Sequence, residues 1–584
     1  MIKRLFIYVG EYKKYLGIIP FVVLLEVLCE LSMPLLMAKV IDVGIPGEDI
    51  RYIAQIGVYM ILLALAAIGL GIVNMHYTTL TSTGFSKNLR NSLFEKVQTF
   101  SFQNIDRFST AFLITRLTND VNNLQITFMM ILRLLLRAPM MLIIAFFLAY
   151  SINAELSIVL AIAIPLLSVG ILLIMRTAVK RFAIVQEKID ALNNTLQENL
   201  IGIRVVKSFV RADFEIQKFG KSNDELTTAG IRAVNIAILN MPLMMLVMNG
   251  ATLAIIWLGG QMVYGGTLGA GELISFLSYI TMILMSVMMI SMVILMSARA
   301  QASGKRVVEV LDSEIDIVDR AQPAQVERQA AGLRPGKVEF KGVSFKYSQS
   351  GAGEDVLSDI SFTAQRGQVI GLVGGTGTGK STLVHLIPRL YDVTGGAVLV
   401  DDVDVRDYAL EALRDKIGVV LQQNTLFSGT IRENLMWGNP AATQAEIETA
   451  CRYAQAHEFI LEFPDGYDTL LGQGGVNVSG GQKQRLCIAR AMLKKPAILI
   501  LDDSTSAVDT ATEARIRAAF YHNLSDTTIF IIAQRISSVR DADRIIVLDD
   551  GEIAGIGTHA ELIANNEIYQ EINASQQEGA LIYG

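Results

Sequence analysis

The chain has 584 residues, of which 52% are hydrophobic and only 18% charged, and its formal net charge is −6. Soluble domains carry about 25% charged residues, so this composition indicates residence in a membrane. The negative charge argues against nucleic acid as a partner, because nucleic-acid-binding surfaces are usually basic. The three cysteines, at positions 29, 451 and 487, show no paired spacing, so we expect neither a disulfide framework nor a zinc site.

The first half of the chain contains apolar runs long enough to cross a bilayer, which takes about 20 mostly apolar residues in a helix. After a first run at 16–41, stretches free of charged residues or nearly so occur at 52–86, 138–154, 156–175, 233–271 and 273–298. The sequence therefore predicts six spans. YSINAE separates the third and fourth spans, and the glycine-rich GGQMVYGGTLGAGE separates the fifth and sixth, as is typical of short exposed loops.

Basic residues collect at the N-terminus and in the two segments that follow spans two and four. By the positive-inside rule, both termini are predicted to lie in the cytoplasm. Both segments lack proline until Pro139 and Pro242, so we expect their helices to continue well into the cytoplasm. The N-terminal stretch lacks a short apolar region followed by a cleavage site, so we expect it to be the uncleaved start of span one.

From residue 338 onward, strand-like runs alternate with helical patterns, which is typical of an α/β domain with a largely parallel sheet. The preceding AQPAQVERQAAGLRPG has the composition of a linker. We therefore predict an all-α membrane domain of six transmembrane helices with long cytoplasmic extensions at 1–320, a linker at 321–337, an α/β domain at 338–576 and a tail at 577–584.

The stretch GLVGGTGTGKST follows one of these strands and precedes a helical pattern. Glycines in such a turn let backbone N–H groups close around phosphates, while the lysine reaches the β/γ oxygens and the next hydroxyl binds Mg²⁺. The C-terminal domain is therefore predicted to be a P-loop nucleotide-binding domain that takes ATP and Mg²⁺. Its predicted loop residues are Gly374, Gly375, Thr376, Gly377, Thr378, Gly379, Lys380, Ser381 and Thr382.

Two further motifs belong to the same domain. AILILDD ends a buried strand in acids, and Asp502 there suits a carboxylate that holds Mg²⁺ at the carboxyl edge of the sheet. VSGGQKQR, at 478–485, opens a helix whose first N–H groups and positive dipole end suit an anion. The same letters also fit an ordinary capped helix start.

Together these motifs resemble the nucleotide-binding domain of ABC transporters, and with six spans nearly the whole chain resembles an ABC exporter half-transporter. The resemblance implies that Tyr347 stacks on adenine and that Gln422 joins Ser381 and Asp502 near Mg²⁺. It also implies a signature motif that acts on the nucleotide of the other subunit of a dimer, formed by Ser479, Gly480, Gly481 and Gln482. STAFLITRLTND and KSFVRADFEIQKF stand where coupling helices touch the nucleotide domains.

Two positions depart from the family's pattern. Asp503 replaces the glutamate that serves as general base, and its side chain is shorter by one C–C bond, about 1.5 Å. A displacement of about 1 Å can cost about 100-fold in rate. Gln534 replaces the switch histidine and cannot become a cation. The nearest histidines in sequence, His522 and His559, offer no rescue, so we expect the site to bind ATP and hydrolyse it poorly.

A degenerate site beside an intact signature resembles the impaired subunit of bacterial heterodimeric multidrug exporters. That likeness implies the bacterial cytoplasmic membrane, a second, different half-transporter with an intact glutamate and histidine, and hydrophobic or amphipathic drug-like cargo. A slow homodimer, a lipid or peptide exporter, and an ATP-gated regulator or channel remain open. The six spans exclude a soluble ABC ATPase that acts on DNA or ribosomes.

Polar and polarizable residues in the spans are candidates for substrate contact. Methionines are frequent in spans five and six, and they fit either varied ligands or ordinary packing. Glu26 and Glu30 lie four residues apart on one face of span one, where acids are costly and suggest function. They are candidates for contact with cationic substrates. The alternatives are pairing with Arg133 or Arg137, or exposure to water on the inner side.

Overall fold

The structure is a computed structural model that describes residues 2–583 except 321–335, 348–354 and 504–507. The chain divides into two compact units, and most of the predicted linker falls outside the described residues. One unit consists of Met1–Gln98 with Thr110–Ser313, and the other of Thr99–Ser109 with Glu314–Gly584. A short internal segment of the first half therefore packs with the second unit.

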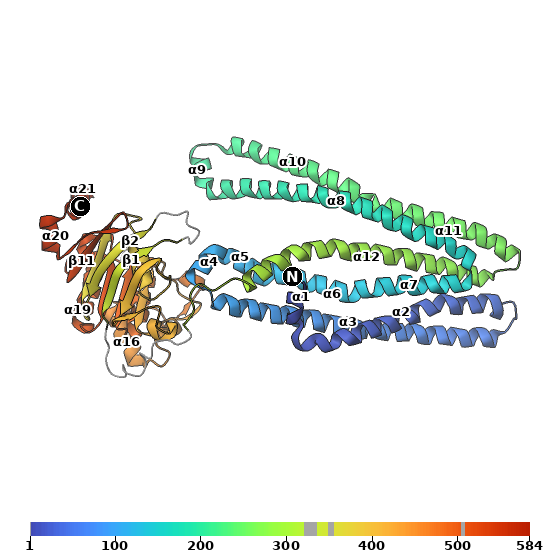
Figure 1. Cartoon of the computed structure of the whole chain (residues 1–584), viewed down its shortest axis with the longest axis horizontal. Helices are drawn as coiled ribbons and strands as arrows, with labels where there is room; N and C mark the ends of the chain where they lie inside the picture. Colours follow the sequence, from blue (N-terminus) through green and yellow to red (C-terminus); the bar gives the residue numbers. More distant parts are fainter. Residues whose placement is uncertain (1, 321–335, 348–354, 504–507, 584) are drawn as a thin grey trace. The chain divides into compact units, whose positions relative to one another are not determined.

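The first unit is built of helices, shown from blue to light green in Figure 1. Among the described residues, six helices are long and apolar enough to cross a membrane, which confirms the six predicted spans. Its elements are α1 Ile2–Leu5, η1 Phe6–Lys14, α2 Tyr15–Lys39, η2 Val40–Gly44, α3 Ile50–Gln98, α5 Thr110–Thr115, η3 Arg116–Asp120, α6 Val121–Met130, η4 Ile131–Leu135, α7 Leu136–Ile152, α8 Ala154–Ile201, α9 Ile203–Ser208, α10 Ala212–Ile238, α11 Asn240–Tyr264 and α12 Ala270–Leu311.

The turn between the fifth and sixth spans is shorter than predicted. Residues 259–264, expected to belong to the loop, form the last turns of α11. Gly259 is buried there, and a Cβ atom on it would come within 2.4 Å of Leu273 Cδ1. The glycine therefore serves close packing of α11 against α12, and only residues 265–269 make the turn.

The α8–α9–α10 hairpin runs apart from the other helices at its α9 end (Figure 1). Its two long helices are joined by ion pairs, with Lys188 Nζ 2.7 Å from Glu225 Oε2 and Lys218 Nζ 2.6 Å from Glu198 Oε2. These pairs fix an antiparallel register between α8 and α10. The helices extend far beyond the charge-free runs, as the sequence predicts.

The second unit is an α/β domain, which confirms the predicted fold class. Its six-stranded sheet has the order β12-β11-β3-β10-β9-β6, beside a four-stranded sheet, β2-β1-β4-β5, and the pair β7-β8. The strands are β1 Val338–Phe345, β2 Leu357–Ala364, β3 Val369–Gly374, β4 Gly395–Val400, β5 Val403–Asp404, β6 Ile417–Val420, β7 Gly429–Thr430, β8 Leu470–Leu471, β9 Ile498–Asp502, β10 Thr528–Ile532, β11 Arg544–Asp549 and β12 Glu552–Gly557.

Helices flank the sheets and follow most of the parallel strands. They are α4 Phe102–Phe108, α13 Lys380–Leu386, α14 Leu410–Asp415, α15 Ile431–Met436, α16 Gln444–Tyr453, α17 His457–Leu461, η6 Gly466–Asp468, η7 Gln473–Gly475, α18 Gly480–Leu493, α19 Thr510–Asn523, η8 Ile536–Ser538, α20 His559–Asn565 and α21 Glu567–Tyr583. Strands β3, β9 and β10 are parallel neighbours, with Ile532 opposite Asp502. Their carboxyl ends therefore meet at one edge of the sheet, the usual place for a ligand.

The segment of the first half that belongs to the second unit is Thr99–Ser109, which contains α4. Phe102 packs against the apolar core of this unit and lies edge-on to Tyr391, whose hydroxyl donates to Asp106 Oδ2 at 2.8 Å. The predicted coupling stretch at 109–120 is thus placed about ten residues too late. It forms α5 and η3 and belongs to the membrane unit apart from Ser109.

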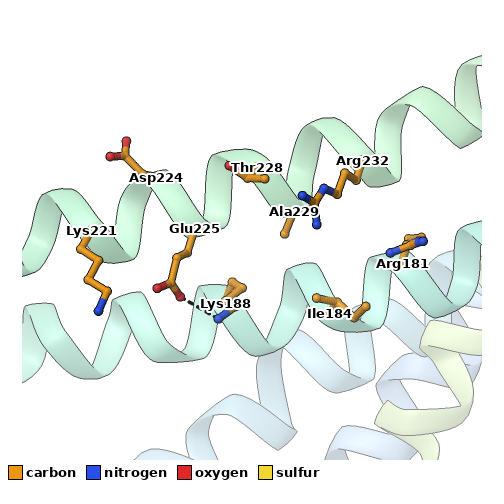
Figure 2. A pocket seen from close by; sticks show the side chains of 9 residues that line it. All are labelled: Arg181, Ile184, Lys188, Lys221, Asp224, Glu225, Thr228, Ala229 and Arg232. Carbon is orange, nitrogen blue, oxygen red and sulfur yellow. Dashed lines mark hydrogen bonds and ion pairs between the residues drawn. The ribbon is translucent and has the colours of Figure 1, made fainter.

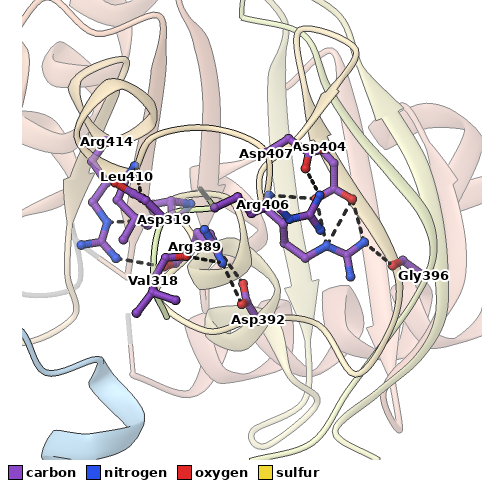
Figure 3. Close-up of polar contacts among 12 residues, drawn as sticks. Val318, Asp319, Arg389, Asp392, Gly396, Asp404, Arg406, Asp407, Leu410 and Arg414 are labelled. Carbon is purple, nitrogen blue, oxygen red and sulfur yellow. Dashed lines mark hydrogen bonds and ion pairs between the residues drawn. The ribbon is translucent and has the colours of Figure 1, made fainter. Parts of the chain in front are cut away.

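The segment after α12, at 314–320, makes polar contacts with the rest of the second unit (Figure 3). Asp319 Oδ1 accepts a hydrogen bond from the backbone N–H of Leu410 at 2.9 Å, and Arg320 forms an ion pair with Asp407. Arg389, itself buried, donates to the Val318 carbonyl at 3.4 Å. These contacts hold the end of the connection before the undescribed residues begin.

A side-chain cap joins the first and last spans at their shared end. The Asp42 carboxylate accepts hydrogen bonds from the backbone N–H groups of Gly271 and Glu272, at 2.7 and 2.9 Å. These are among the N–H groups that a helix start leaves without partners inside the helix, and a carboxylate there also opposes the helix dipole. Asp42, which lies in η2, therefore caps and stabilises the first turn of α12.

We expect Asp42→Ala to destabilise the membrane unit by about 2 kcal/mol, because two charge-assisted hydrogen bonds are lost. Thermal unfolding of the purified chain in detergent should show an apparent Tm lower by a few degrees. Asp42→Asn, which keeps one acceptor oxygen, should lose less. An unchanged Tm for the alanine variant would contradict the role assigned to this cap.

Candidate functional site

The loop after β3 has a backbone that only glycine can adopt at several positions. Gly374, Gly377 and Gly379 have φ of 151°, 86° and 86°. A Cβ on Gly374 would lie 2.2 Å from the Leu548 carbonyl oxygen, and one on Gly379 would lie 2.8 Å from that of Val356. The loop thus exposes its N–H groups before α13, as phosphate binding requires.

The lysine of this loop is already held by it. Lys380 Nζ donates to the Gly374 carbonyl at 3.0 Å and to Thr378 Oγ1 at 3.3 Å, and it also contacts the Gly375 carbonyl. Burial lowers the pKa of Lys380, while the charges of Asp502 and Asp503 oppose that shift. The ammonium group is thus placed over the loop, where the phosphate oxygens of a nucleotide would replace the carbonyl contacts.

The predicted magnesium ligands Ser381 and Asp502 are adjacent. Ser381 Oγ donates to Asp502 Oδ1 at 2.8 Å, and Asp502 is buried at the end of β9. Gln422 is exposed in the segment after β6. Hydroxyl and carboxylate oxygens fit Mg²⁺, which takes few protein ligands and completes its shell with phosphates and water. Among the described residues, no group of three or more His, Cys, Asp or Glu suited to a metal occurs.

One residue at the site was missed from the sequence. His385 Nε2 lies 3.4 Å from Asp502 Oδ2, and this nitrogen is buried without a hydrogen-bond partner among the described residues. The residue lies on α13, four positions after Ser381, so both side chains face β9. The spacing is the signal that could have found it. Its imidazole therefore lies against Asp502, the predicted magnesium ligand.

The two departures from the family's pattern contact each other. Gln534 Nε2 donates to Asp503 Oδ2 at 2.7 Å. Asp503 has a left-handed backbone, with φ of 44°. Burial and the charge of Asp502 raise the pKa of Asp503, and hydrogen bonds from Gln534 and Gln422 and the charge of Lys380 act in the opposite sense. The glutamine side chain thus occupies one oxygen of the candidate base.

Tyr347 lies beside the phosphate loop. Its hydroxyl is 2.8 Å from Thr382 Oγ1, and its ring lies edge-on to Tyr391, with centroids 5.3 Å apart. The residue is 46% exposed, so one side of the ring is open to a planar ligand. Thr382 itself is buried.

The signature residues begin α18. Ser479 caps the helix: its Oγ accepts from the Gln482 N–H at 3.3 Å, and its own N–H donates to Gln482 Oε1 at 2.8 Å. This is the ordinary capped start that the sequence also allows. Ser479 and Gly480 are exposed, so the helix start with Gly481 remains accessible to a ligand. The family resemblance also implies a D-loop at 506–509, after Asp503, of which residues 506 and 507 lie outside the described residues.

Glu26 and Glu30 lie in the membrane unit and share one arginine. Arg137 Nη1 is 2.5 Å from Glu26 Oε1, and Nη2 is 2.5 Å from Glu30 Oε2. Asn74 donates to the other oxygen of Glu26 at 3.2 Å. The pairing with Arg137, one of the alternatives drawn from the sequence, is therefore present. The Glu30 side chain is 36% exposed and the Glu26 side chain 11%.

Comparisons with known proteins agree with both units. Residues 16–287 match the family ABC transporter transmembrane region, and residues 357–506 match the family ABC transporter. The uncharacterized ABC transporter ATP-binding protein YfiB of Bacillus subtilis is 40% identical, covering 97% of both chains. An ATP-dependent lipid A-core flippase of Syntrophus aciditrophicus is 36% identical over 84% of this chain and 80% of its own length.

Among solved structures, a bacterial Atm1-family ABC exporter with ATP bound has the same fold. Its TM-score is 0.79 at 23% identity, covering 97% of this chain and 99% of that one. With the phosphate loop, the adjacent Ser381 and Asp502 and the six spans in place, the chain belongs to the ABC transporter family and is an ABC exporter half-transporter, a multi-pass membrane protein with one ATP-hydrolysing domain.

Proposed function

We propose that this chain is one subunit of a heterodimeric exporter in the bacterial cytoplasmic membrane, with both termini in the cytoplasm. Its own ATP site hydrolyses slowly, and its signature serves a competent site on a different half-transporter. The observation that carries this proposal is the contact between Asp503 and Gln534. Both positions that would activate water are altered, and the altered side chains are hydrogen-bonded to each other.

Asp503 is a poor general base because of the position of its carboxylate and not because of its pKa. Its raised pKa brings a carboxylate closer to neutral pH, which by itself would favour proton abstraction. The side chain is shorter than glutamate by about 1.5 Å, however, and displacements of about 1 Å already cost about 100-fold. In addition, Gln534 occupies Oδ2 with a neutral donor that cannot accept the proton in turn.

The binding functions of the site are complete by contrast. The loop N–H groups and Lys380 bind the phosphates, and Tyr347 stacks on adenine. Ser381, Gln422 and Asp502 hold Mg²⁺, which neutralises phosphate charge when bound. ATP can therefore remain at this site and hold two nucleotide domains together through turnovers, while the partner's site hydrolyses.

The favoured cargo is a hydrophobic or amphipathic, drug-like compound. Met244 is buried between helices, whereas Met245, Met285 and Met292 are each more than 40% exposed. Flexible methionines on open surfaces accommodate ligands of different shapes. The lipid-exporter alternative also has an observation in its favour, because a relative of 36% identity is named a lipid A-core flippase.

The purified chain alone should show negligible Mg-ATPase activity in lipid nanodiscs. The double change Asp503→Glu with Gln534→His should raise that rate about 100-fold, because the base regains its length and the switch its cation. Adding Lys380→Ala to the double variant is the control and should remove the gain. Robust turnover of the unchanged chain alone would favour the homodimer and overturn the impaired-site assignment.

In a complex with a partner that restores turnover, changes in this chain should have unequal effects. Gly480→Asp should lower the ATPase rate at least about 100-fold, because it places a negative charge opposite the partner's nucleotide. The new aspartate sits in a first helical turn, where it favours the helix, so folding is preserved. Gly480→Ala is the matched control for the added side chain.

Lys380→Ala in the same complex should cost less than about tenfold, because the site that it impairs contributes little hydrolysis. Initial rates at saturating ATP give both comparisons. Equal losses from Gly480→Asp and Lys380→Ala would indicate two equivalent sites and contradict the asymmetry.

If Glu30 contacts cationic cargo, Glu30→Gln should lower export of a cationic amphipathic dye about fivefold, since one exposed charge contributes about 1 kcal/mol. Uptake into inside-out vesicles measures this. A neutral dye of similar size is the control and should be unaffected. Equal losses for both dyes would assign Glu30 to the packing of Arg137 instead.

A further inference from the structure

A cavity lined by charged residues of the membrane unit lies between α8 and α10 (Figure 2). Its volume is about 580 Å³, and four basic and two acidic residues contribute to its lining. It lies outside the nucleotide site, and the proposed function does not use it. The residues that line it are Arg181, Ile184, Lys188, Lys221, Asp224, Glu225, Thr228, Ala229 and Arg232.

The two ends of this cavity differ in how their charge is balanced. At one end Lys188 is neutralised by Glu225, with 2.7 Å between Nζ and Oε2, and Lys221 is close by (Figure 2). At the other end lie Arg181 and Arg232. In the part of the chain that the structure describes, neither guanidinium forms a hydrogen bond or an ion pair, and both residues are exposed.

The helix register places these two arginines opposite each other. Lys188 pairs with Glu225, and two helical turns further along the antiparallel pair Arg181 on α8 comes level with Arg232 on α10. Ile184, Thr228 and Ala229 lie between them and the neutralised end (Figure 2). Two like charges that face each other across packed helices repel, and an anion between them removes that repulsion.

The position along the helices indicates which anion is available. Arg181 lies six residues beyond Met175, the end of the charge-free run, which is about 9 Å along a helix. Arg232 directly precedes the next charge-free run. The headgroup layer of a bilayer is about 5–8 Å thick on each side of the hydrocarbon, and long basic side chains reach back toward it. The pair therefore lies at the depth of lipid phosphates.

Apolar surface continues from the arginine pair toward the membrane. Leu173, two turns before Arg181, is 60% exposed, and Leu239, two turns after Arg232, is 53% exposed. Residues eight apart share one stripe of a helix, so Leu173 lies on the membrane side of Arg181, and Leu239, which directly follows α10, lies on the membrane side of Arg232. A ligand with a phosphate and acyl chains would use both features, whereas free phosphate would leave the leucines unused.

We propose that Arg181 and Arg232 form a binding site for the phosphate of an anionic phospholipid of the inner leaflet, whose acyl chains lie along Leu173 and Leu239. Guanidinium groups suit this role because they bind phosphate oxygens in a bidentate manner. Basic cavities between membrane helices on the cytoplasmic side are known to take such headgroups. A lipid bound here bridges α8 and α10 near the point where the hairpin leaves the membrane.

Native mass spectrometry of the purified full chain in detergent tests the proposal, with phosphatidylglycerol or phosphatidylcholine added in equal amounts. The chain should bind one phosphatidylglycerol in preference to phosphatidylcholine. Arg181→Gln with Arg232→Gln should weaken that binding roughly 30-fold, since each basic side chain contributes about a factor of five near anionic lipid. Arg176→Gln with Lys180→Gln removes the same charge from exposed sites outside the cavity and should change it little.

The lysine pair Arg181→Lys with Arg232→Lys keeps both charges and should retain most of the binding, which separates loss of charge from loss of fold. Equal weakening by the two glutamine pairs, or none by the first, would overturn the site. Displacement of phosphatidylglycerol by millimolar inorganic phosphate would identify a soluble anion as the ligand and reject the lipid.

Discussion

The parallel register of β3, β9 and β10 is the constraint on which the nucleotide site depends. Because these strands run side by side in the same direction, Gly374, Asp502 and Ile532 end at one edge of the sheet. The phosphate loop lies more than a hundred residues before Asp502 and the switch position in the sequence, yet the three meet at this edge because of the strand order alone. The hydrogen bond from Ser381 to Asp502 closes the arrangement.

Asp503 and Gln534 should be understood as one change rather than two. Their positions follow β9 and β10, which are direct neighbours, so a substitution at either place alters the surroundings of the other. A histidine against this carboxylate would add a positive charge and hold the acid ionised, whereas a glutamine amide satisfies it without charge. Burial and the charge of Asp502 therefore raise the pKa of Asp503, and the hydrogen bonds from Gln534 and Gln422 and the charge of Lys380 offset only part of that rise. Under the proposed function, this neutral pairing suits nucleotide binding better than proton transfer.

Motifs of fixed spacing made the fold and most of the site predictable. The glycines at 374, 377 and 379 indicate a left-handed backbone that other residues rarely adopt, and the charge-free runs predict the membrane spans. What escaped prediction depends on contacts between distant segments. The segment that joins the nucleotide-binding unit is Thr99–Ser109 because Phe102 fits an apolar core formed some 250 residues later. The sequence of Thr99–Ser109 alone does not indicate that this segment packs against the core of the second unit.

The same reason explains His385 and the loop after span five. The four-residue spacing places His385 on the same face of α13 as Ser381, but the fold is needed to show that this face contacts Asp502. Gly259 suggested a loop by its type, but Leu273 of the next helix occupies the space where its side chain would be. Glycine thus marks either a turn or a close approach of helices, and the local sequence does not distinguish them.

The membrane unit has two sites with unbalanced charge, which is negative at Glu26 and Glu30 and positive at the α8–α10 cavity. The sign of the charge constrains which ligand each site can bind. One guanidinium, that of Arg137, faces two carboxylates, so Glu26 and Glu30 leave one negative charge in excess. At the α8–α10 cavity Arg181 and Arg232 lie level with each other, and neither forms an ion pair with an acid within the described part of the chain. An exposed cation can be satisfied by lipid phosphate, which every bilayer supplies. An acid within an apolar span has no such resident partner, so its counter-ion must come from the protein or from a transient ligand.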